Sequence, residues 1–137
     1  MTECIIVPVY DEMDIIVARQ KGRELASEIQ FSVIDRARIT TVISELARNI
    51  YLYTNCGIIE LKALESDENN RKGMQIRAVD SGPGIKDIRL VLESGYSTSG
   101  GLGAGISGVR RMMDEFYITS KVGDGTEIIA IKWRDVC

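Results

Sequence analysis

The sequence contains no histidine among its 137 residues. Catalysis by a histidine base, metal binding by imidazole and phosphorylation of a histidine are therefore excluded on this chain. The N-terminus has no basic segment followed by a long apolar run, and no apolar run approaches the length that spans a membrane. We therefore expect neither a signal peptide nor a transmembrane helix.

Cysteines are few as well, and the chain has no excess of positive charge. Cys4, Cys56 and Cys137 are odd in number, widely spaced and part of no Cys-x-x-Cys pattern. This arrangement favours reduced thiols over a disulfide framework or a metal site, so the expected compartment is the cytoplasm. The net charge of −3 gives no indication of binding to nucleic acid or to an anionic membrane.

Glycine, in contrast, is concentrated in one stretch. Eight of the 13 glycines lie between Asp80 and Gly108. Glycine loses more backbone entropy on folding than any other residue, so this density indicates close approach of the backbone to a ligand, most often the phosphates of a nucleotide. Two clusters, Gly82–Gly84 and Gly100–Gly105, flank a segment with helical apolar spacing. They predict a mobile flap between two hinges and a helix N-terminus that can receive an anion.

Apolar periodicity predicts the order strand, helix, helix, strand, strand, flap, helix, strand, strand. Asp14 is expected to cap the first helix, and Asn55–Gly57 to end the second. Pro8 suggests that the first strand lies at a sheet edge. The expected strands are 4–9, 57–65, 73–80, 117–122 and 126–133, and the expected helices are 14–29, 33–53 and 106–116.

The distribution of these elements favours an α+β sandwich. Helices cluster early and strands come as hairpins, which argues against a doubly wound parallel sheet. No repeat, linker or low-complexity segment interrupts the chain, so we expect one domain over residues 1–137.

Candidate functional residues lie on the second helix and at the end of a strand. Glu45 and Asn49 are one helical turn apart and are expected to border the core, where their oxygens could share a hard cation. On spacing alone, a solvated helix face is the better interpretation. Asp80 ends an apolar strand and opens an Asp-Ser-Gly-Pro-Gly turn; its carboxylate can accept a hydrogen bond from an exocyclic amine such as that of adenine.

The glycine-rich motifs are weak when each is taken alone. Gly101-x-Gly103-x-Gly105 lacks the preceding strand and the later acidic residue of a dinucleotide-binding motif, and no Gly-Lys-Ser/Thr of a P-loop follows it. Gly125-Thr126 on its own indicates only a hairpin turn.

Four of these motifs together resemble the N, G1, G2 and G3 boxes of the GHKL ATPases. The resemblance spans nearly the whole chain and implies the Bergerat nucleotide fold: a two-layer α/β sandwich with a mixed, mainly antiparallel sheet covered by helices on one face. Four motifs in this order are specific where each alone is not. They are Glu45-x-x-x-Asn49, Asp80-x-Gly82-x-Gly84, Gly101-x-Gly103 and Gly125-Thr126.

Within this superfamily the chain resembles the small bacterial serine/threonine switch kinases of the stressosome, especially in ELARNIYLYT, DSGPGI and GLGAGISGVRRMMDEF. The resemblance implies an ATP-dependent kinase that phosphorylates STAS-domain partners in a stress-signalling partner switch and activates a PP2C-type phosphatase when released. Two alternatives stay open: an anti-sigma factor kinase, and an interaction module in which ATP only sets the shape that binds a partner. A sensor histidine kinase would need a phosphoacceptor histidine.

The resemblance also implies roles for individual residues. Glu45 would be the general base, Asn49 would hold Mg²⁺ against the phosphates of ATP, and Asp80 would accept the adenine amine. Residues 94–100 would form the ATP lid, in which Ser99 and Gly100 replace the arginine of anti-sigma kinases, so the phosphate-clamping cation would come from Arg110, Arg111 or a partner. The expected nucleotide contacts are Asn49, Asp80, Gly82, Gly84, Ile85, Ser99, Gly100, Gly101, Leu102, Gly103, Ala104, Gly105 and Thr126.

Overall fold

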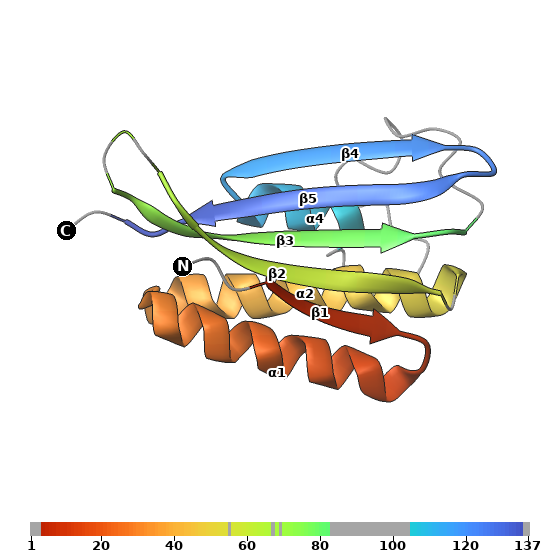
Figure 1. Cartoon of the computed structure of the whole chain (residues 1–137), viewed down its shortest axis with the longest axis horizontal. Coiled ribbons are helices and arrows are strands. Elements are labelled where there is room, and N and C mark those ends of the chain that lie inside the picture. The colour runs from red at the N-terminus through yellow and green to blue at the C-terminus, as the bar shows by residue number, and fades with distance from the viewer. Residues whose placement is uncertain (1–3, 55, 67, 69, 83–104, 136–137) are drawn as a thin grey trace.

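The sheet and the helices form two layers, with the helices against one face of the sheet (Figure 1). The computed structural model describes residues 4–54, 56–66, 68, 70–82 and 105–135. The expected α+β class and the order of the described elements are confirmed. The strands are β1 (Cys4–Val9), β2 (Gly57–Glu65), β3 (Lys72–Asp80), β4 (Glu115–Lys121) and β5 (Gly125–Trp133), and the helices are α1 (Glu12–Ile29), α2 (Val33–Tyr53) and α4 (Gly105–Met112).

The strands lie in the order β1-β2-β3-β5-β4. Every pairing between them in the described part of the chain is antiparallel, although a mixed sheet was expected. Pro8 lies in the edge strand β1, as predicted. None of the described helices is long and apolar enough to cross a membrane.

Helix α1 begins earlier than predicted, because two acidic residues share the capping. Asp11 is the N-cap and Asp14 is the third helical residue. The Asp14 amide donates to Oδ1 of Asp11 at 3.3 Å, and the Asp11 amide donates to Oδ2 of Asp14 at 3.1 Å. This reciprocal arrangement satisfies two backbone donors of the first turn. The prediction of Asp14 as the cap was therefore wrong by three residues.

Helix α2 begins as predicted but does not end at a glycine. Ser32 caps it by accepting a hydrogen bond from the Asp35 amide at 3.1 Å. Its last cap is Thr54, whose amide and hydroxyl both donate to the Ile50 carbonyl. Gly57 lies in β2 instead, where a Cβ atom would stand 2.5 Å from the Val79 carbonyl oxygen of β3. This glycine therefore allows β2 and β3 to approach closely, and it does not end α2 in a left-handed conformation.

Helix α4 ends four residues earlier than the expected 116, and the chain joins the sheet at once. The Asp114 amide donates to the Ile131 carbonyl at 2.9 Å, and β4 starts at Glu115. Phe116 consequently pairs with Ala130 across the sheet. The spacing of the apolar residues 109, 112, 113 and 116 fits a helix equally well, so periodicity alone placed this boundary too late.

The core lies between α1, α2, α4 and the inner face of the sheet. The helix α2 stripe of Ile39, Ile43, Leu46 and Ile50 is buried as predicted. Gly22 of α1 packs where an added Cβ would collide with Cδ1 of Ile43, so this glycine brings the two helices together. Alternate residues of each strand complete the core: Val7, Val9, Ile59, Leu61, Met74, Ile76, Ala78, Ile128 and Ala130.

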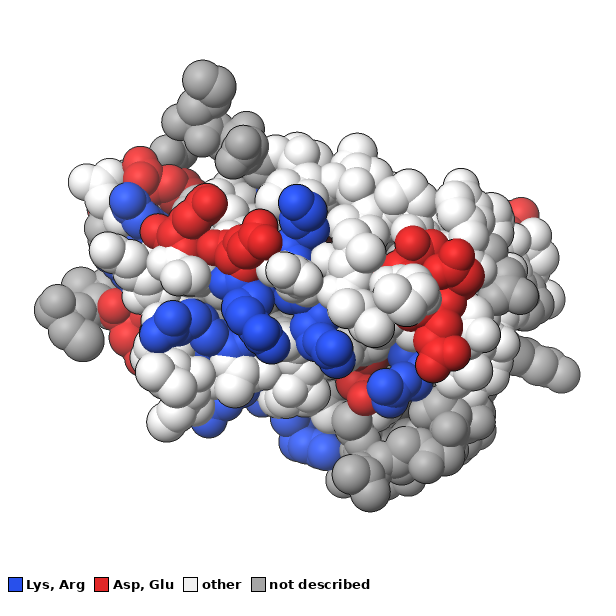
Figure 2. Space-filling model, turned by 90° about the horizontal axis from the view of Figure 1, so that it is seen from below, with Lys and Arg blue, Asp and Glu red and all other residues white. Residues whose placement is uncertain are grey.

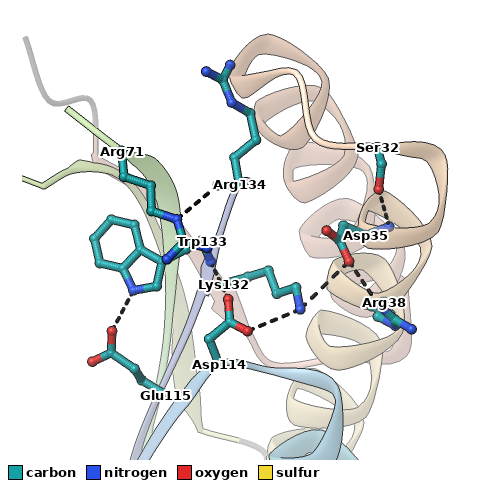
Figure 3. A network of polar contacts seen from close by, with 9 residues as sticks. All are labelled: Ser32, Asp35, Arg38, Arg71, Asp114, Glu115, Lys132, Trp133 and Arg134. Carbon is teal, nitrogen blue, oxygen red and sulfur yellow. Dashed lines mark hydrogen bonds and ion pairs between the residues drawn. The ribbon is translucent and has the colours of Figure 1, made fainter. Parts of the chain in front are cut away.

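A polar network joins the start of α2 to the end of β5 (Figure 3). Buried Asp35 accepts a hydrogen bond from Nη1 of Arg38 at 3.0 Å, and its Oδ1 lies 3.7 Å from Nζ of Lys132. Lys132 also contacts Oδ1 of Asp114 at 3.4 Å. The backbone amide of Trp133 donates to the other oxygen of Asp114 at 2.7 Å. Each carboxylate therefore has a partner, and the network links the two layers.

Candidate nucleotide-binding site

The opposite end of α2 meets the ends of three strands. In the register of the sheet, Asp80 of β3 lies between Gly57 of β2 and Thr126 of β5. Asp80 follows buried Ala78 by two residues, and Thr126 precedes buried Ile128 by two, so both side chains are on the inner, helix-covered face. A carboxylate and a hydroxyl are thus brought side by side at this edge.

The Asp80 carboxylate is oriented by the turn that follows it. Its Oδ1 accepts a hydrogen bond from the Gly82 amide at 2.9 Å. The other oxygen, Oδ2, has no hydrogen bond to the residues that the structure describes. An acceptor that is fixed on one side and available on the other is suited to an incoming amine.

Two glycines of the predicted motifs pack tightly against the protein itself. A Cβ at Gly82 would collide with the Thr54 side chain at the end of α2, and Gly125, with φ of 88°, would collide with the Asp80 carbonyl oxygen. Only glycine adopts such a positive φ without strain. The expectation that Gly82 lets the adenine approach stays a prediction, and the structure adds an internal packing reason for the residue.

Thr126 is buried and held by a second hydroxyl. Its Oγ1 lies 2.8 Å from Oγ of Ser120, which also donates to the Gly125 carbonyl at 3.1 Å. Ser120 was not among the expected site residues, although the Gly-Asp-Gly turn places it opposite Thr126 in the hairpin. An open hollow of about 190 Å³ borders this edge and is lined in part by Asp80, Ser120 and Thr126.

Glu45 is more deeply buried than a residue at the border of the core. Its exposed fraction is 8%, Oε1 lies 3.6 Å from Nη1 of Arg48, and Oε2 is buried without a hydrogen-bond partner in the described residues. Asn49, one turn further, is partly buried. An unpartnered buried acceptor typically costs about 1–3 kcal/mol, so a donor from outside the described residues is expected here.

Helix α4 supplies another buried polar atom, a hydroxyl, that has no hydrogen-bond partner among the described residues. Ser107 is 2% exposed, and its Oγ has no hydrogen bond within the described part of the chain. Gly105 opens the helix with φ of 37°. Ser107 was missed from the sequence because a serine in a glycine-rich run is ordinarily a turn residue. Arg110 and Arg111, the proposed cations, lie in the last turn of α4, away from its N-terminus.

The remaining expected contacts cannot be placed. Gly84, Ile85, Ser99, Gly100, Gly101, Leu102, Gly103 and Ala104 lie outside the described residues, as does the lid expected at 94–100.

The residues that can be placed extend from the sheet edge along α2. At about 1.5 Å per residue, Asn49 is ~7.5 Å and Glu45 ~13.5 Å before Thr54 along the helix axis. Thr54 contacts the Asp80–Gly82 turn. This separation between the residues expected to contact adenine and those expected to contact the phosphates fits an elongated ligand such as a nucleoside triphosphate.

The fold and these motifs define a class of ATP-binding protein. Residues 34–135 match the family of histidine kinase-, DNA gyrase B- and HSP90-like ATPases. The chain belongs to this family, and the recognition based on the four motifs is confirmed.

One relative is similar over nearly the whole chain. It is the serine/threonine-protein kinase RsbT of Bacillus subtilis (strain 168), which is 55% identical over 133 residues, covering 97% of this chain and 98% of that kinase. The expected enzyme class, a serine/threonine-protein kinase, is thereby confirmed.

Two solved structures share the fold at low sequence identity. The RsbU and RsbW domains of Rv1364c from Mycobacterium tuberculosis match with a TM-score of 0.64 and 18% identity, covering 98% of this chain but 33% of that one. The mycobacterial sensor histidine kinase MprB matches with a TM-score of 0.56 and 16% identity over 100% of both chains. At such identities these likenesses show the fold alone.

Proposed function

We propose that this chain phosphorylates serine or threonine residues of STAS-domain partner proteins in a bacterial stress-signalling partner switch. The observation that carries the proposal is the buried Glu45 carboxylate, whose Oε2 has no partner in the described residues. It lies one turn before Asn49, in a chain that is 55% identical to a serine/threonine kinase.

Glu45 is the proposed general base. A serine or threonine hydroxyl is a poor nucleophile, and a positioned carboxylate assists by accepting its proton as the phosphoryl group is transferred. The hydroxyl oxygen bonds to the γ-phosphorus, the bond from that phosphorus to the β,γ-bridging oxygen breaks, and ADP leaves. Arg48 holds Oε1, so Oε2 remains to accept the proton.

The other placed residues are proposed to bind the nucleotide. Oδ2 of Asp80 would accept a hydrogen bond from the exocyclic amine of adenine, and Thr126 would support the same edge. The amide oxygen of Asn49 would hold Mg²⁺, which neutralises charge on the phosphates when bound. The described residues contain no group of three or more acidic, cysteine or histidine ligands, as suits a Mg²⁺ held mainly by phosphates and water.

The proposed switch has a second output, in which the kinase released from its STAS partner activates a PP2C-type phosphatase. Two other assignments give different results. An anti-sigma factor kinase would bind a sigma factor directly, and an interaction module would bind its partner in an ATP-dependent manner without transferring phosphate.

Phosphate transfer to purified partners tests the proposal. The chain is incubated with γ-labelled ATP, Mg²⁺ and candidate STAS-domain proteins, and the label is located by peptide mapping. We expect acid-stable label on a serine or threonine of a STAS protein, and none when Mg²⁺ is removed by a chelator. Binding of ATP and partner without transfer would overturn the kinase assignment, and co-purification with a sigma factor would favour the anti-sigma assignment.

A further inference from the structure

Helix α1 carries an exposed apolar stripe on the side away from the core. Met13, Ile16 and Val17 are 65%, 43% and 43% exposed. Together with Gln20 they follow the i, i+3, i+4, i+7 spacing of a single helix face. Single exposed apolar residues are ordinary on protein surfaces, but a continuous stripe along one helix indicates a contact surface.

Charged residues are sorted by sign over residues 11–23, the part of the chain that carries the stripe. Figure 2 shows red side chains at the right-hand end, where α1 begins in Figure 1, a row of blue side chains across the middle, uncharged surface between them, and a second red group beside the left half of the blue row. Over residues 11–23 the acidic residues precede the middle of the stripe and the basic residues follow it: Asp11, Glu12, Asp14, Arg19, Lys21 and Arg23. Two further acidic residues, Glu24 and Glu28, lie beyond this segment in the last part of the helix.

Each flank of the stripe carries both acidic and basic side chains. Glu12, Arg19 and Arg23 are spaced i, i+7, i+11, which places them on one flank at about 100° per residue. Asp14 and Lys21, spaced i, i+7, lie on the other. Within the described part of the chain, no ion pair involves Glu12, Arg19 or Arg23.

This pattern is complementary to itself. A two-fold axis perpendicular to two α1 helices makes them antiparallel and brings the same flank of each into contact. With the axis between Ile16 and Val17, Glu12 of one copy lies level with residue 21 of the second copy, between its Arg19 and Arg23. The apolar side chains then meet at the centre. A parallel pair would instead place equal charges at equal heights.

We propose that α1 docks antiparallel against α1 of a second copy of this chain, through the apolar stripe and the two Glu12–arginine contacts. A single helix face buries less than the roughly 1,200 Å² of a standard stable interface, so the dimer is weak and forms at high local concentration. The proposal rests on the charge pattern of α1 and does not depend on the kinase function.

Complementary charge reversal tests this interface. Sedimentation velocity over a concentration series measures self-association of the wild type, of Glu12→Lys, and of the double variant Arg19→Glu/Arg23→Glu. Each variant alone places equal charges in contact, and we expect its dimer dissociation constant to rise about tenfold or more. An equimolar mixture of the two variants restores both contacts, because each copy supplies what the other needs. The mixture should associate as the wild type does, and higher salt should weaken both.

Two controls keep the result specific. Glu28→Lys changes the same charge on the same helix, but level with residue 5 of the second copy, beyond its α1, and should leave association unchanged. Ile16→Asp should abolish dimerisation, and circular dichroism should confirm that every variant keeps its fold. A wild type that stays monomeric, or a variant mixture that does not associate, would overturn the proposal. If Ile16→Asp abolished binding of a STAS protein while self-association stayed normal, the stripe would belong to that partner instead.

Discussion

At the N-terminal end of α2, the buried carboxylate of Asp35 is paired with Arg38 and Lys132, and Lys132 is paired again with Asp114. Further along the same helix, the buried Oε2 of Glu45 has no partner in the described residues, and the same is true of Oγ of Ser107 in the adjacent α4. The first arrangement joins the helices to the sheet. The second leaves polar atoms whose partners lie outside the described residues.

The two parts of α2 thus differ in whether their buried polar groups are paired within the described residues. A buried polar group without a partner is unfavourable, so we expect its partner in a ligand or among the residues outside the described ranges. The remaining unpartnered atom in the described part of the chain is Nε of Arg36. A guanidinium has four other N–H donors, so one unused donor costs less than an unused carboxylate oxygen.

The largest effect is expected where the unpartnered oxygen is the proposed base. Glu45→Gln keeps the shape of the side chain but removes its basicity, so phosphate transfer should fall by about 10²–10⁴ while ATP affinity stays close to the wild type. Single-turnover transfer to a STAS partner and calorimetry with ATP measure the two quantities. The exposed Glu28→Gln serves as the control and should change neither. Wild-type transfer by Glu45→Gln would assign the base to another group.

Removing a partner from the Asp35 network should instead lower the stability of the fold. Asp35→Ala leaves the largely buried Lys132 with one carboxylate partner fewer, and we expect the free energy of unfolding to fall by about 3 kcal/mol. Urea unfolding measures the change. Asp124→Ala removes a carboxylate from the exposed pair with Lys121 and should cost less than about 1 kcal/mol. Equal losses in the two variants would contradict the structural role assigned to the Asp35 network.

Asp80→Asn tests the proposed adenine contact. The amide would present its own donors to the adenine amine, or lose the hydrogen bond to Gly82. We expect ATP binding to weaken by about 1–3 kcal/mol, with the unfolding free energy of the nucleotide-free protein less affected. Calorimetry with ATP and with a triphosphate that lacks the exocyclic amine separates the two effects. A variant that discriminates between these nucleotides as the wild type does would contradict the assignment.

A smaller, metal-dependent effect is expected from Asn49→Ala. Loss of a Mg²⁺ ligand should weaken Mg·ATP binding roughly tenfold, and raising Mg²⁺ should recover part of it. Glu45→Gln should show no such recovery. Affinity measured across a Mg²⁺ series distinguishes the two residues, and an Asn49 variant insensitive to Mg²⁺ would exclude it as a ligand.

The sequence allowed the fold to be predicted more fully than the site. The α2 stripe and the two hairpins were predictable because apolar periodicity and turn residues act locally. The end of α4 was not, since it depends on hydrogen bonds from Asp114 to residues 131 and 133 of a later strand.

For the site, the motifs identified Asp80 and Thr126, and the sheet register brings them together. Ser107 and the pairing of Asp35 with Lys132 were not predictable, because burial and long-range partners are properties of the packed chain. Glu45 was selected by the motif, but only its burial distinguishes it from a solvated helix residue.

The smallest effect is expected at Ser120, a partly buried residue whose hydroxyl lies beside that of buried Thr126 at the sheet edge proposed to bind the nucleotide. Ser120→Ala removes the hydroxyl that lies 2.8 Å from Oγ1 of Thr126 and should lower the unfolding free energy by about 1 kcal/mol. If Thr126 also contacts the nucleotide, a saturating concentration of ATP should recover part of this loss, because the ligand supplies the missing partner. A double-mutant cycle with Thr126→Val, with and without ATP, measures the coupling of the two hydroxyls. An equal coupling energy in both conditions would show that Thr126 acts in packing alone. The Ser120–Thr126 pair would then stabilise the fold, as the Asp35 network does, and would not contact the nucleotide.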